Sequence, residues 1–552
     1  MKNKKTFLYL LILFLSPGII YSQQHNSLNG NEYLNQKSIA VYIGRNLTVD
    51  GSVLLGGFGH EPSSHWIEIV PRQYHEEGAK WKVGVTEKAT IPGKLIEIPQ
   101  TSVTYKYITS FYSEFSGFPP PLTNGGLNEY GVAARDVWSP SRPELVKMSR
   151  MKSRETPQTG PNYSDLSKAA MERAQTARDA VLIVGELINK YGYSTYGGNS
   201  HLFADNNEGW VFINYAGGLG LWAAERLGPD DIRVSYPGYI GQFPVNHEEF
   251  DDYMASENLI TFIKEQGWWD GKGDWINLRE ILGVPFPGEN SGLNSNFYSR
   301  AQHPQHREAE LMDKLPVSLE FLISYIRDPR WSTDLAGYGQ VAHLRPDVHP
   351  ELQTLWVAVT TSSVTPFIPI PVGAVDVPAE FKQHRYMTKG SYSRFMNPDY
   401  AALEATRYAT RTFKRLLYHI SEHPTQYLKP VTAEIESFER ILFDERNSIE
   451  RKAMTYFYAG EDARARDFLT EIVMQRMMKS LDLGEKLVSE VEKRIRNEHG
   501  IRMPFGYKAT GETTPASSQR MDTKGMVHVY HPSLDEYPRG HGIYEIFRGL
   551  IE

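Results

Sequence analysis

Short apolar runs separated by turn residues dominate the first two thirds of the chain, beginning with residues 38–43 and 52–55. β-branched residues are frequent in both runs, and Asp50-Gly51 directly before the second run supplies the positive φ that a tight turn needs. The pattern predicts two adjacent antiparallel strands. Ser38 then stands at the end of the first strand, and we expect it to face a cleft.

Further β-type runs continue to about residue 373 and are interrupted by one long helical pattern at 164–191. Ser and Asp residues at the start of this pattern favour helix capping, and Gly192 is a typical end signal. Strands are expected at 65–71, 101–109, 131–138, 201–204, 210–215, 221–227, 232–236, 354–361 and 367–371.

The periodicity becomes helical after about residue 398, where charged residues are many and glycine is almost absent. Three amphipathic helices are expected at 400–421, 430–443 and 461–499. The chain therefore divides into a core domain at 38–380, a helical region at 381–500 and a Gly/Pro-bearing tail at 501–552. Strands with helices packed on both faces predict an α+β core of layered architecture.

The N-terminus has the pattern of a secretory signal. Basic residues among the first five precede an apolar stretch at 7–20, and the small residue Ser22 ends a predicted signal peptide at 1–22. A membrane anchor is the alternative, but Pro17-Gly18 interrupts a stretch already short for about 30 Å of hydrocarbon. We therefore expect export to the periplasm or the medium, with no membrane span after signal removal. The polar segment 23–37 suits a flexible pro-segment.

Charge and cysteine content exclude several classes of function. The formal net charge is −7, from 59 basic and 66 acidic residues without a block of one sign, so the chain has no pattern of a nucleic-acid binder. Cysteine is absent. This excludes disulfides, thiolate zinc sites and a thiol nucleophile.

Several segments together resemble the C69 family of dipeptidases, which are N-terminal-nucleophile hydrolases. The opening hairpin is similar to the start of that family, with Ser38 at the position of its first cysteine. Further similar segments are 125–133 (Gly-Gly-Leu-Asn-Glu-Tyr-Gly-Val-Ala), 172–180, 204–210, 221–231, and 355–358 with 366–371. Each segment alone is also ordinary turn or core chemistry. The resemblance implies a four-layer αββα sandwich of N-terminal-nucleophile hydrolases over the core domain.

The resemblance also implies a mechanism in which one residue is both nucleophile and base. The side chain attacks an amide carbonyl, and the free α-amine, with a pKa of about 7.7–8.0, takes its proton. Serine can serve in principle, but an internal Ser38 cannot, because its nitrogen is acylated. Residues 23–37 must first be removed by cleavage after Lys37.

Other positions depart from the family pattern. Where the family has an Arg-Asn-x-Asp-like run that contacts the nucleophile and the substrate amine, this chain has Gly57-Phe58-Gly59-His60. An expected asparagine, an oxyanion donor in the family, aligns with Tyr236. Either the site is rebuilt around Ser38, with His60 and Tyr236 as substrate-binding candidates, or it has lost hydrolysis. The two hypotheses are an exported dipeptidase-type hydrolase of small peptides and an inactive binding or structural protein of the same fold.

Metal and phosphate sites are weaker alternatives. His60-Glu61 with His65, His303 with His306, and His343 with His349 lack the His-Glu-x-x-His helical spacing, so core or surface roles are favoured. The glycines at 56–59 precede no predicted helix, and no Gly-x-Ser-x-Gly elbow occurs. We expect no metal and no cofactor. The sequence leaves the oligomeric state open.

Overall fold

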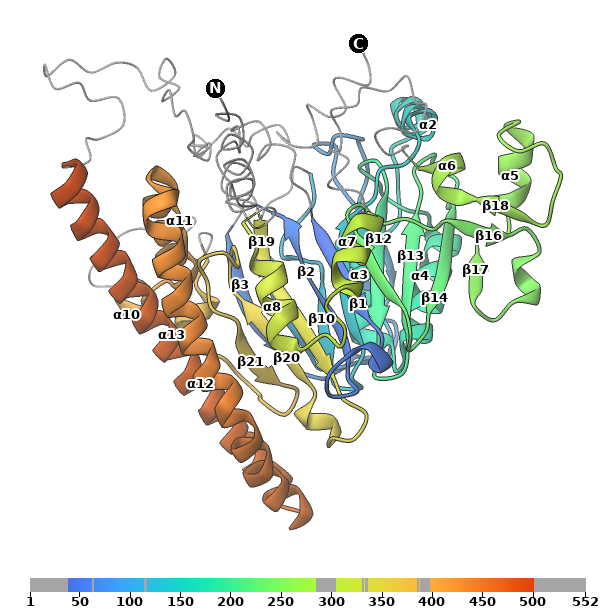
Figure 1. Cartoon of the computed structure of the whole chain (residues 1–552). Coiled ribbons are helices and arrows are strands. Elements are labelled where there is room, and N and C mark those ends of the chain that lie inside the picture. Colours follow the sequence, from blue (N-terminus) through green and yellow to red (C-terminus); the bar gives the residue numbers. More distant parts are fainter. Residues whose placement is uncertain are drawn as a thin grey trace, which may run out of the picture.

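The computed structural model describes residues 38–500, apart from 62–63, 114–116, 284–303, 330–331, 333–335, 385–386 and 388–397. The predicted signal peptide 1–22, pro-segment 23–37 and tail 501–552 lie outside the described residues. Two large antiparallel sheets with helices form the body of the molecule, and long helices flank it (Figure 1). The α+β class predicted from the sequence is confirmed.

The first predicted hairpin begins the smaller sheet. Ile39 pairs with Phe58 and Ile43 with Leu54, and Gly51 in the connection has φ +71°. The predicted antiparallel pairing is confirmed, with a 3₁₀ turn, η1 (Arg45–Leu47), added to the connection. In the described chain this sheet has the order β15 (Ile232–Ser235), β1 (Ile39–Ile43), β2 (Val53–His60), β19 (Ala336–Leu344), β20 (Thr354–Ala358) and β21 (Ile368–Pro371).

The larger sheet contains most of the other predicted strands. The runs at 210–215 and 221–227 form neighbouring strands in it, as expected, whereas the run at 101–109 is divided between two strands. Among the described residues its order is β17 (Tyr253–Ala255), β14 (Trp222–Leu227), β13 (Gly209–Asn214), β12 (Asn199–Ala204), β11 (Ala133–Trp138), β10 (Gly125–Asn128), β8 (Tyr107–Tyr112) and β3 (His65–Val70), with β9 (Leu122–Thr123) beside β8.

Smaller elements lie around the two sheets. They are the strand pairs β4 (Gln73–Tyr74) with β7 (Val103–Thr104), β5 (Lys80–Val83) with β6 (Ile96–Pro99), and β16 (Gln242–Pro244) with β18 (Trp275–Asn277); the helices α2 (Pro143–Glu155), α5 (Leu259–Glu265), α6 (Leu278–Leu282), α7 (Pro304–Met312) and α9 (Ala379–Lys382); and the 3₁₀ turns η2 (His247–Glu249) and η4 (Pro350–Leu352).

The single helix predicted at 164–191 is wrong, because the segment forms two helices, α3 (Tyr163–Arg173) and α4 (Ala177–Tyr191). The side-chain amide of Asn128, from β10, donates to the carbonyls of Met171 and Ala174 at 3.1 and 2.8 Å. Thr176 is extended and caps the next helix. A distant strand therefore supplies the hydrogen bonds that a continuous helix would have made.

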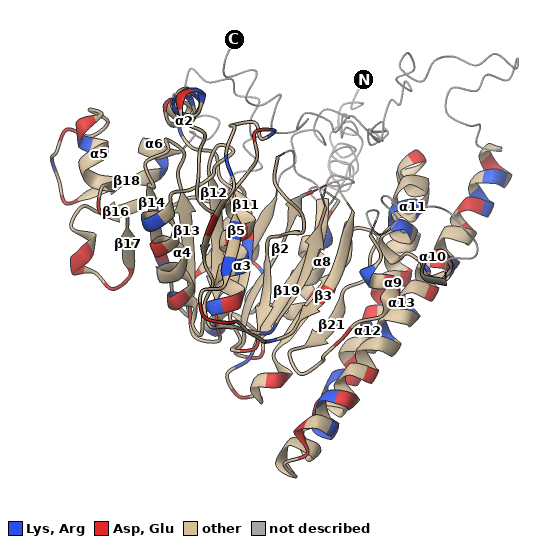
Figure 2. Cartoon of the chain, turned by 180° about the vertical axis from the view of Figure 1, so that it is seen from behind, with Lys and Arg blue, Asp and Glu red and all other residues tan. Residues whose placement is uncertain are grey.

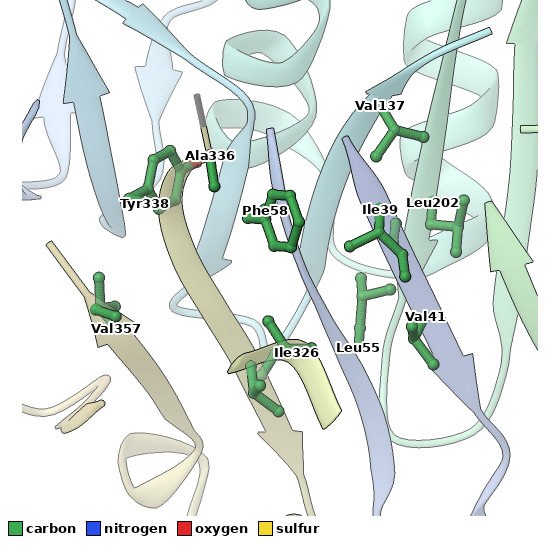
Figure 3. Packing of buried hydrophobic residues seen from close by; sticks show 14 of the residues in the cluster. Ile39, Val41, Leu55, Phe58, Val137, Leu202, Ile326, Ala336, Tyr338 and Val357 are labelled. Atoms are coloured by element: carbon green, nitrogen blue, oxygen red, sulfur yellow. The ribbon is translucent and has the colours of Figure 1, made fainter. Parts of the chain in front are cut away.

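The two sheets pack against each other and share one apolar core (Figure 3). Tyr42 of β1 reaches the larger sheet, where its hydroxyl donates to the Gly228 carbonyl at 3.0 Å and its ring fills the space beside Gly209. Helices α3 and α4 pack on strands of the larger sheet, and α8 (Leu319–Arg327) packs on β2 and β19 of the smaller sheet.

The helical region differs from prediction at two places. The helix expected at 400–421 is divided into α10 (Pro398–Ala405) and α11 (Ala409–Glu422), and the one expected at 430–443 is α12 (Pro424–Tyr458), in which Pro430 is interior. The third is confirmed as α13 (Asp462–His499). Both charge signs are frequent on these helices, while the central strands are mostly uncharged (Figure 2). Within the described part of the chain, no helix is both long and apolar enough to cross a bilayer.

A buried ion pair joins the helical region to the core. Two guanidinium nitrogens of Arg327, at the end of α8, donate to the carboxylate of Glu439 on α12, and one of these hydrogen bonds is 2.8 Å long. The third nitrogen, Nε, donates to the Ser362 carbonyl at 3.0 Å. Glu439 also accepts the Phe367 backbone N–H at 2.7 Å. Both charges are therefore paired and hydrogen-bonded, as burial requires.

The contact between α3 and the larger sheet predicts a pH dependence of stability. His201 of β12 is buried, with Nε2 3.2 Å from the Tyr163 carbonyl and 3.1 Å from the Ser167 hydroxyl. Burial lowers the pKa of His201 to about 4, whereas an unfolded histidine titrates at about 6.5. The unfolded chain thus binds more protons between these values, so the free energy of unfolding falls as the pH drops from about 6.5 to about 4.

We expect His201→Gln to lose less stability than the wild type over this pH range, measured by urea unfolding at steps from pH 8 to pH 4. At pH 8 the histidine is neutral in both states, so unfolding there measures the packing cost of the substitution alone. Equal slopes against pH in the two proteins would contradict the assignment.

Candidate active site

Ser38 directly precedes β1 and is only 4% exposed. Its hydroxyl oxygen accepts a hydrogen bond of 3.0 Å from the backbone N–H of Trp138, at the end of β11 in the larger sheet. Ser38 alternates along the strand with Ala40 and Tyr42, so these three side chains share one face. The Ser38 side chain therefore lies between the two sheets.

The backbone brings all three predicted site residues to one end of the smaller sheet. Ser235 pairs with Ala40, and Tyr236 follows directly, buried and joined to Pro237 by a cis peptide bond. His60 is the last residue of β2, two residues beyond Phe58, the partner of Ile39. Ser38, Tyr236 and His60 thus stand at the ends of the three neighbouring strands β1, β15 and β2.

The buried carboxylate of Glu61, weighed from the sequence only as a possible metal ligand, lies at the same end of the smaller sheet. Glu61 is 6% exposed and accepts a hydrogen bond from the side-chain amide of Asn124. Its carboxylate lies 3.5 Å from a guanidinium nitrogen of Arg135 and 3.5 Å from Nε2 of His65. The sequence signal that could have pointed to this cluster is Arg135-Asp136, two adjacent charged residues within the mostly apolar strand pattern at 131–138.

The surroundings of Glu61 are polar but closed to solvent. Asn124 accepts a hydrogen bond of 2.9 Å from the Tyr112 hydroxyl, and the Arg135 guanidinium lies 4.7 Å from the centre of the Tyr338 ring. Burial lowers the pKa of His65, so this ring is neutral near pH 7. Glu61 and Arg135 are therefore the charged pair of the cluster.

The pair retains unused hydrogen-bonding capacity. Among the described residues, Glu61 Oε2 and Arg135 Nε and Nη1 have no hydrogen-bond partner. Buried charged groups are normally hydrogen-bonded in full, because an unmade bond leaves the desolvation cost uncompensated. The cluster can therefore bind a further donor or acceptor.

Glycines in β2 and β19 make room for this arrangement. A Cβ on Gly57, whose φ is +152°, would lie 2.0 Å from the Ile39 carbonyl oxygen. The position that aligns with the arginine of the resembled family therefore has no space for any side chain. A Cβ on Gly59 or on Gly337 would instead collide with the Glu61 carboxylate, at 1.5 and 2.0 Å.

A small pocket of about 20 Å³ adjoins the segments that follow β11 and β15. Its lining residues include Ser139, which follows Trp138, and Pro237, which follows Tyr236. The Ser139 hydroxyl donates a hydrogen bond of 2.8 Å to the Gly238 carbonyl, and both residues line the pocket. Ser38 does not line it. The lining residues are Ser139, Pro140, Ile213, Tyr215, Pro237, Gly238, Tyr239, Ile240, Leu278, Arg279 and Gly283.

The histidines proposed as alternative metal ligands do not come together where the structure describes them. His343 is buried and bonds Asp50 at 2.7 Å, and His349 stacks on Phe457 with 4.0 Å between ring centres. His303 lies outside the described residues. In the described ranges, no three His, Asp or Glu side chains are grouped so that they could hold a metal ion.

Comparison with known proteins gives two findings. The sequence model described as "Peptidase family C69" matches residues 41–316. A protein of Salmonella dublin named "Probable dipeptidase" is 25% identical over 238 residues, which are 42% of this chain and 49% of that protein. The chain thus spans about half the length of this curated relative. The family match begins three residues after Ser38, so it does not include the predicted nucleophile.

The packing at β2 predicts that Gly57 tolerates no side chain. We expect Gly57→Ala to lower the free energy of unfolding by about 2 kcal/mol or more, because the added Cβ meets the Ile39 carbonyl in a strained backbone conformation. Thermal unfolding measures the change. Gly241→Ala is the control, since a Cβ there meets nothing within 4 Å. Equal melting temperatures for the two variants would contradict the prediction.

Proposed function

Because the chain belongs to peptidase family C69, we propose that it is an exported peptidase that hydrolyses amide bonds of small peptides, with Ser38 as its N-terminal nucleophile. The observation that carries the proposal is the position of Ser38. Ser38 directly precedes the first strand of a central hairpin, and its hydroxyl is buried between the two sheets. The charged pair Glu61–Arg135 lies at the same end of these strands.

The proposed chemistry uses the two groups of one residue. After cleavage at Lys37-Ser38, the Ser38 hydroxyl oxygen bonds to the substrate carbonyl carbon while its proton moves to the Ser38 α-amine. The amide C–N bond then breaks, and the same proton leaves with the departing amine. Water hydrolyses the remaining ester by the reverse sequence and frees the serine.

The proposal includes the finer fold and its location. We assign the two facing sheets, with α3 and α4 on one side and α8 on the other, to the four-layer αββα sandwich of N-terminal-nucleophile hydrolases. Residues 1–22 would direct the chain to the periplasm or the medium, and residues 23–37 would be removed after export. The relative named as a probable dipeptidase supports short peptides as substrates.

The pocket beside the site is mostly apolar but small, with about 20 Å³ of open space. Pro140, Ile213, Ile240 and Leu278 give it apolar walls, and its lining among the described residues contains no carboxylate. Apolar walls with few polar groups are typical of small-molecule sites.

A second candidate function is peptide binding without hydrolysis. The observation that favours it is Gly57, where the backbone excludes the side chain that the family pattern supplies at the aligned position. Such a protein would keep the fold and the pocket but would not cut the bound peptide.

Replacement of Ser38 distinguishes the two candidates. The full-length gene is expressed with export, and the N-terminus of the purified protein is sequenced. We expect it to begin at Ser38 and to hydrolyse members of a dipeptide panel. Ser38→Ala should abolish hydrolysis with a loss of stability of about 1–3 kcal/mol, because the buried Trp138 N–H loses its acceptor. Ser38→Cys should keep or raise the rate, because a thiol ionises more readily.

Ser149→Ala is a matched control, because the buried Ser149 hydroxyl also accepts a backbone N–H, that of Gly217 at 2.7 Å. This variant should keep full activity. Hydrolysis by protein that begins at Gln23 would contradict the mechanism. If the wild type and Ser38→Cys both begin at residue 38 and neither hydrolyses any dipeptide, the result would favour peptide binding without hydrolysis. Equal activity in the wild type and Ser38→Ala would contradict both functions.

A further inference from the structure

We propose that the Glu61 carboxylate holds the free α-amine of Ser38, and so acts as the positioning residue for the group that serves as base. This inference rests on the proposed function, because it requires a chain that begins at Ser38. Neither the family match nor the residue pattern of the resembled family assigns a role to Glu61.

The Glu61 carboxylate lies across the β1–β2 pair from Ser38. Ile39 pairs with Phe58, and one further step of this register sets Ser38 opposite Gly59. Facing residues of an antiparallel pair point to the same side of the sheet, with Cβ atoms about 4.5–5.5 Å apart. The Glu61 oxygen lies only 1.5 Å from the point where a Gly59 Cβ would be. The carboxylate therefore occupies the place of a side chain directly beside Ser38.

Gly59 and Gly337 leave room for the Glu61 carboxylate. Neither Gly59 nor Gly337 has a positive φ, so the backbone conformation does not require glycine at these positions. A Cβ at either position would strike the Glu61 carboxylate, at 1.5 Å and 2.0 Å respectively. These two absent side chains form a recess in adjacent strands, and the recess is filled by the carboxylate.

The charges around Glu61 also favour a contact with an ammonium group. The titratable and charged groups around Glu61 include Arg135, His65, Asp136 and four tyrosines, Tyr112, Tyr163, Tyr196 and Tyr338. Burial keeps His65 neutral and raises the pKa of Asp136 well above its usual range, so it favours the neutral acid there. Arg135 lies 3.5 Å from Oε1, the Glu61 oxygen beside Gly59, and Oε2 lies on the Gly337 side, 3.5 Å from His65 Nε2, with no closer hydrogen bond to the described residues, so the carboxylate can accept a further donor. An α-ammonium beside it supplies N–H donors and a positive charge.

The consequence for catalysis follows from the charge of the amine. In the attack step the Ser38 amine accepts the hydroxyl proton and becomes an ammonium, and it gives the same proton to the leaving amine. A fixed carboxylate within about 4–6 Å stabilises the ammonium form and raises the amine pKa. It also orients the nitrogen toward the hydroxyl of the same residue. Glu61 neither gains nor loses a proton in these steps.

The test measures the amine directly, apart from hydrolysis. Protein that has been processed to Ser38 is treated with cyanate over a pH series, and carbamylation of the Ser38 peptide is followed by mass spectrometry. Cyanate reacts with the unprotonated amine, so the profile gives the amine pKa. We expect the Glu61→Gln profile to lie about one pH unit or more below that of the wild type, because a nearby opposite charge is removed.

Three further variants make the result specific. Glu61→Asp keeps the charge and should retain most of the wild-type profile, whereas Gly59→Ala should displace the carboxylate and shift the profile in the same direction as Glu61→Gln. Glu97→Gln removes an exposed carboxylate that pairs with Lys80 at 3.5 Å, and should leave the profile unchanged. Thermal melting shows that each variant is folded, and Gly59→Ala replaces Glu61→Gln if the latter is not.

The outcomes separate this inference from the proposed function. Identical profiles for the wild type, Glu61→Gln and Gly59→Ala would overturn the role of Glu61, even where the wild type hydrolyses dipeptides. A shifted profile in a protein that hydrolyses no dipeptide would support the contact but reject the peptidase. A chain whose purified form begins before Ser38 would overturn both, because no free amine would exist at residue 38.

Discussion

The absence of side chains near the end of strand β2 is the constraint on which this end of the molecule depends. Gly56 faces α8, where a Cβ would lie 2.6 Å from Ile326, so the helix packs directly on the strand. Gly57 lets the backbone of β1 approach, and Gly59 leaves the space that Glu61 fills. The glycine-rich run at 56–59 therefore allows three close contacts of β2, with helix α8, with strand β1 and with the Glu61 carboxylate. Its composition resembles that of a phosphate-binding loop, but its role is close packing within a sheet.

Two buried Arg–Glu pairs in the described part of the chain differ in how completely they are hydrogen-bonded. Arg327 and Glu439 use each other, the Ser362 carbonyl and the Phe367 N–H, so the burial cost of both charges is offset. Glu61 and Arg135 are equally buried but keep oxygen and nitrogen atoms without partners in the described structure. The first pair is sufficient as a structural link between α8 and α12. The second costs stability as it stands, which is typical of groups retained for binding or chemistry.

Local patterns predicted most strands, the hairpin at Ser38 and the existence of the C-terminal helices, because alternation, turn residues and helical periodicity act within a few residues. Errors arose where a distant group competes with local propensity. The helix at 164–191 is broken because Asn128, in another element, bonds to its carbonyls. The role of Glu61 could not be read from its neighbours in sequence, since its recess is completed by Gly337 on β19. Tyr236 and His60 were placed near Ser38 only through the family resemblance, and the strand register supplies the physical reason.

The structure changes how the departures from the family pattern are to be weighed. Gly57 alone suggests a site that has lost a guanidinium, and the local backbone excludes its return. Yet Arg135 brings a guanidinium to the same end of the sandwich from the opposite sheet, and Glu61 brings a carboxylate from just beyond β2. A site without function would have no reason to bury two incompletely bonded charges, because apolar residues of similar volume are commonly as stable or more stable. The charged groups at this end are therefore better explained as a rearranged site around Ser38 than as the remains of one.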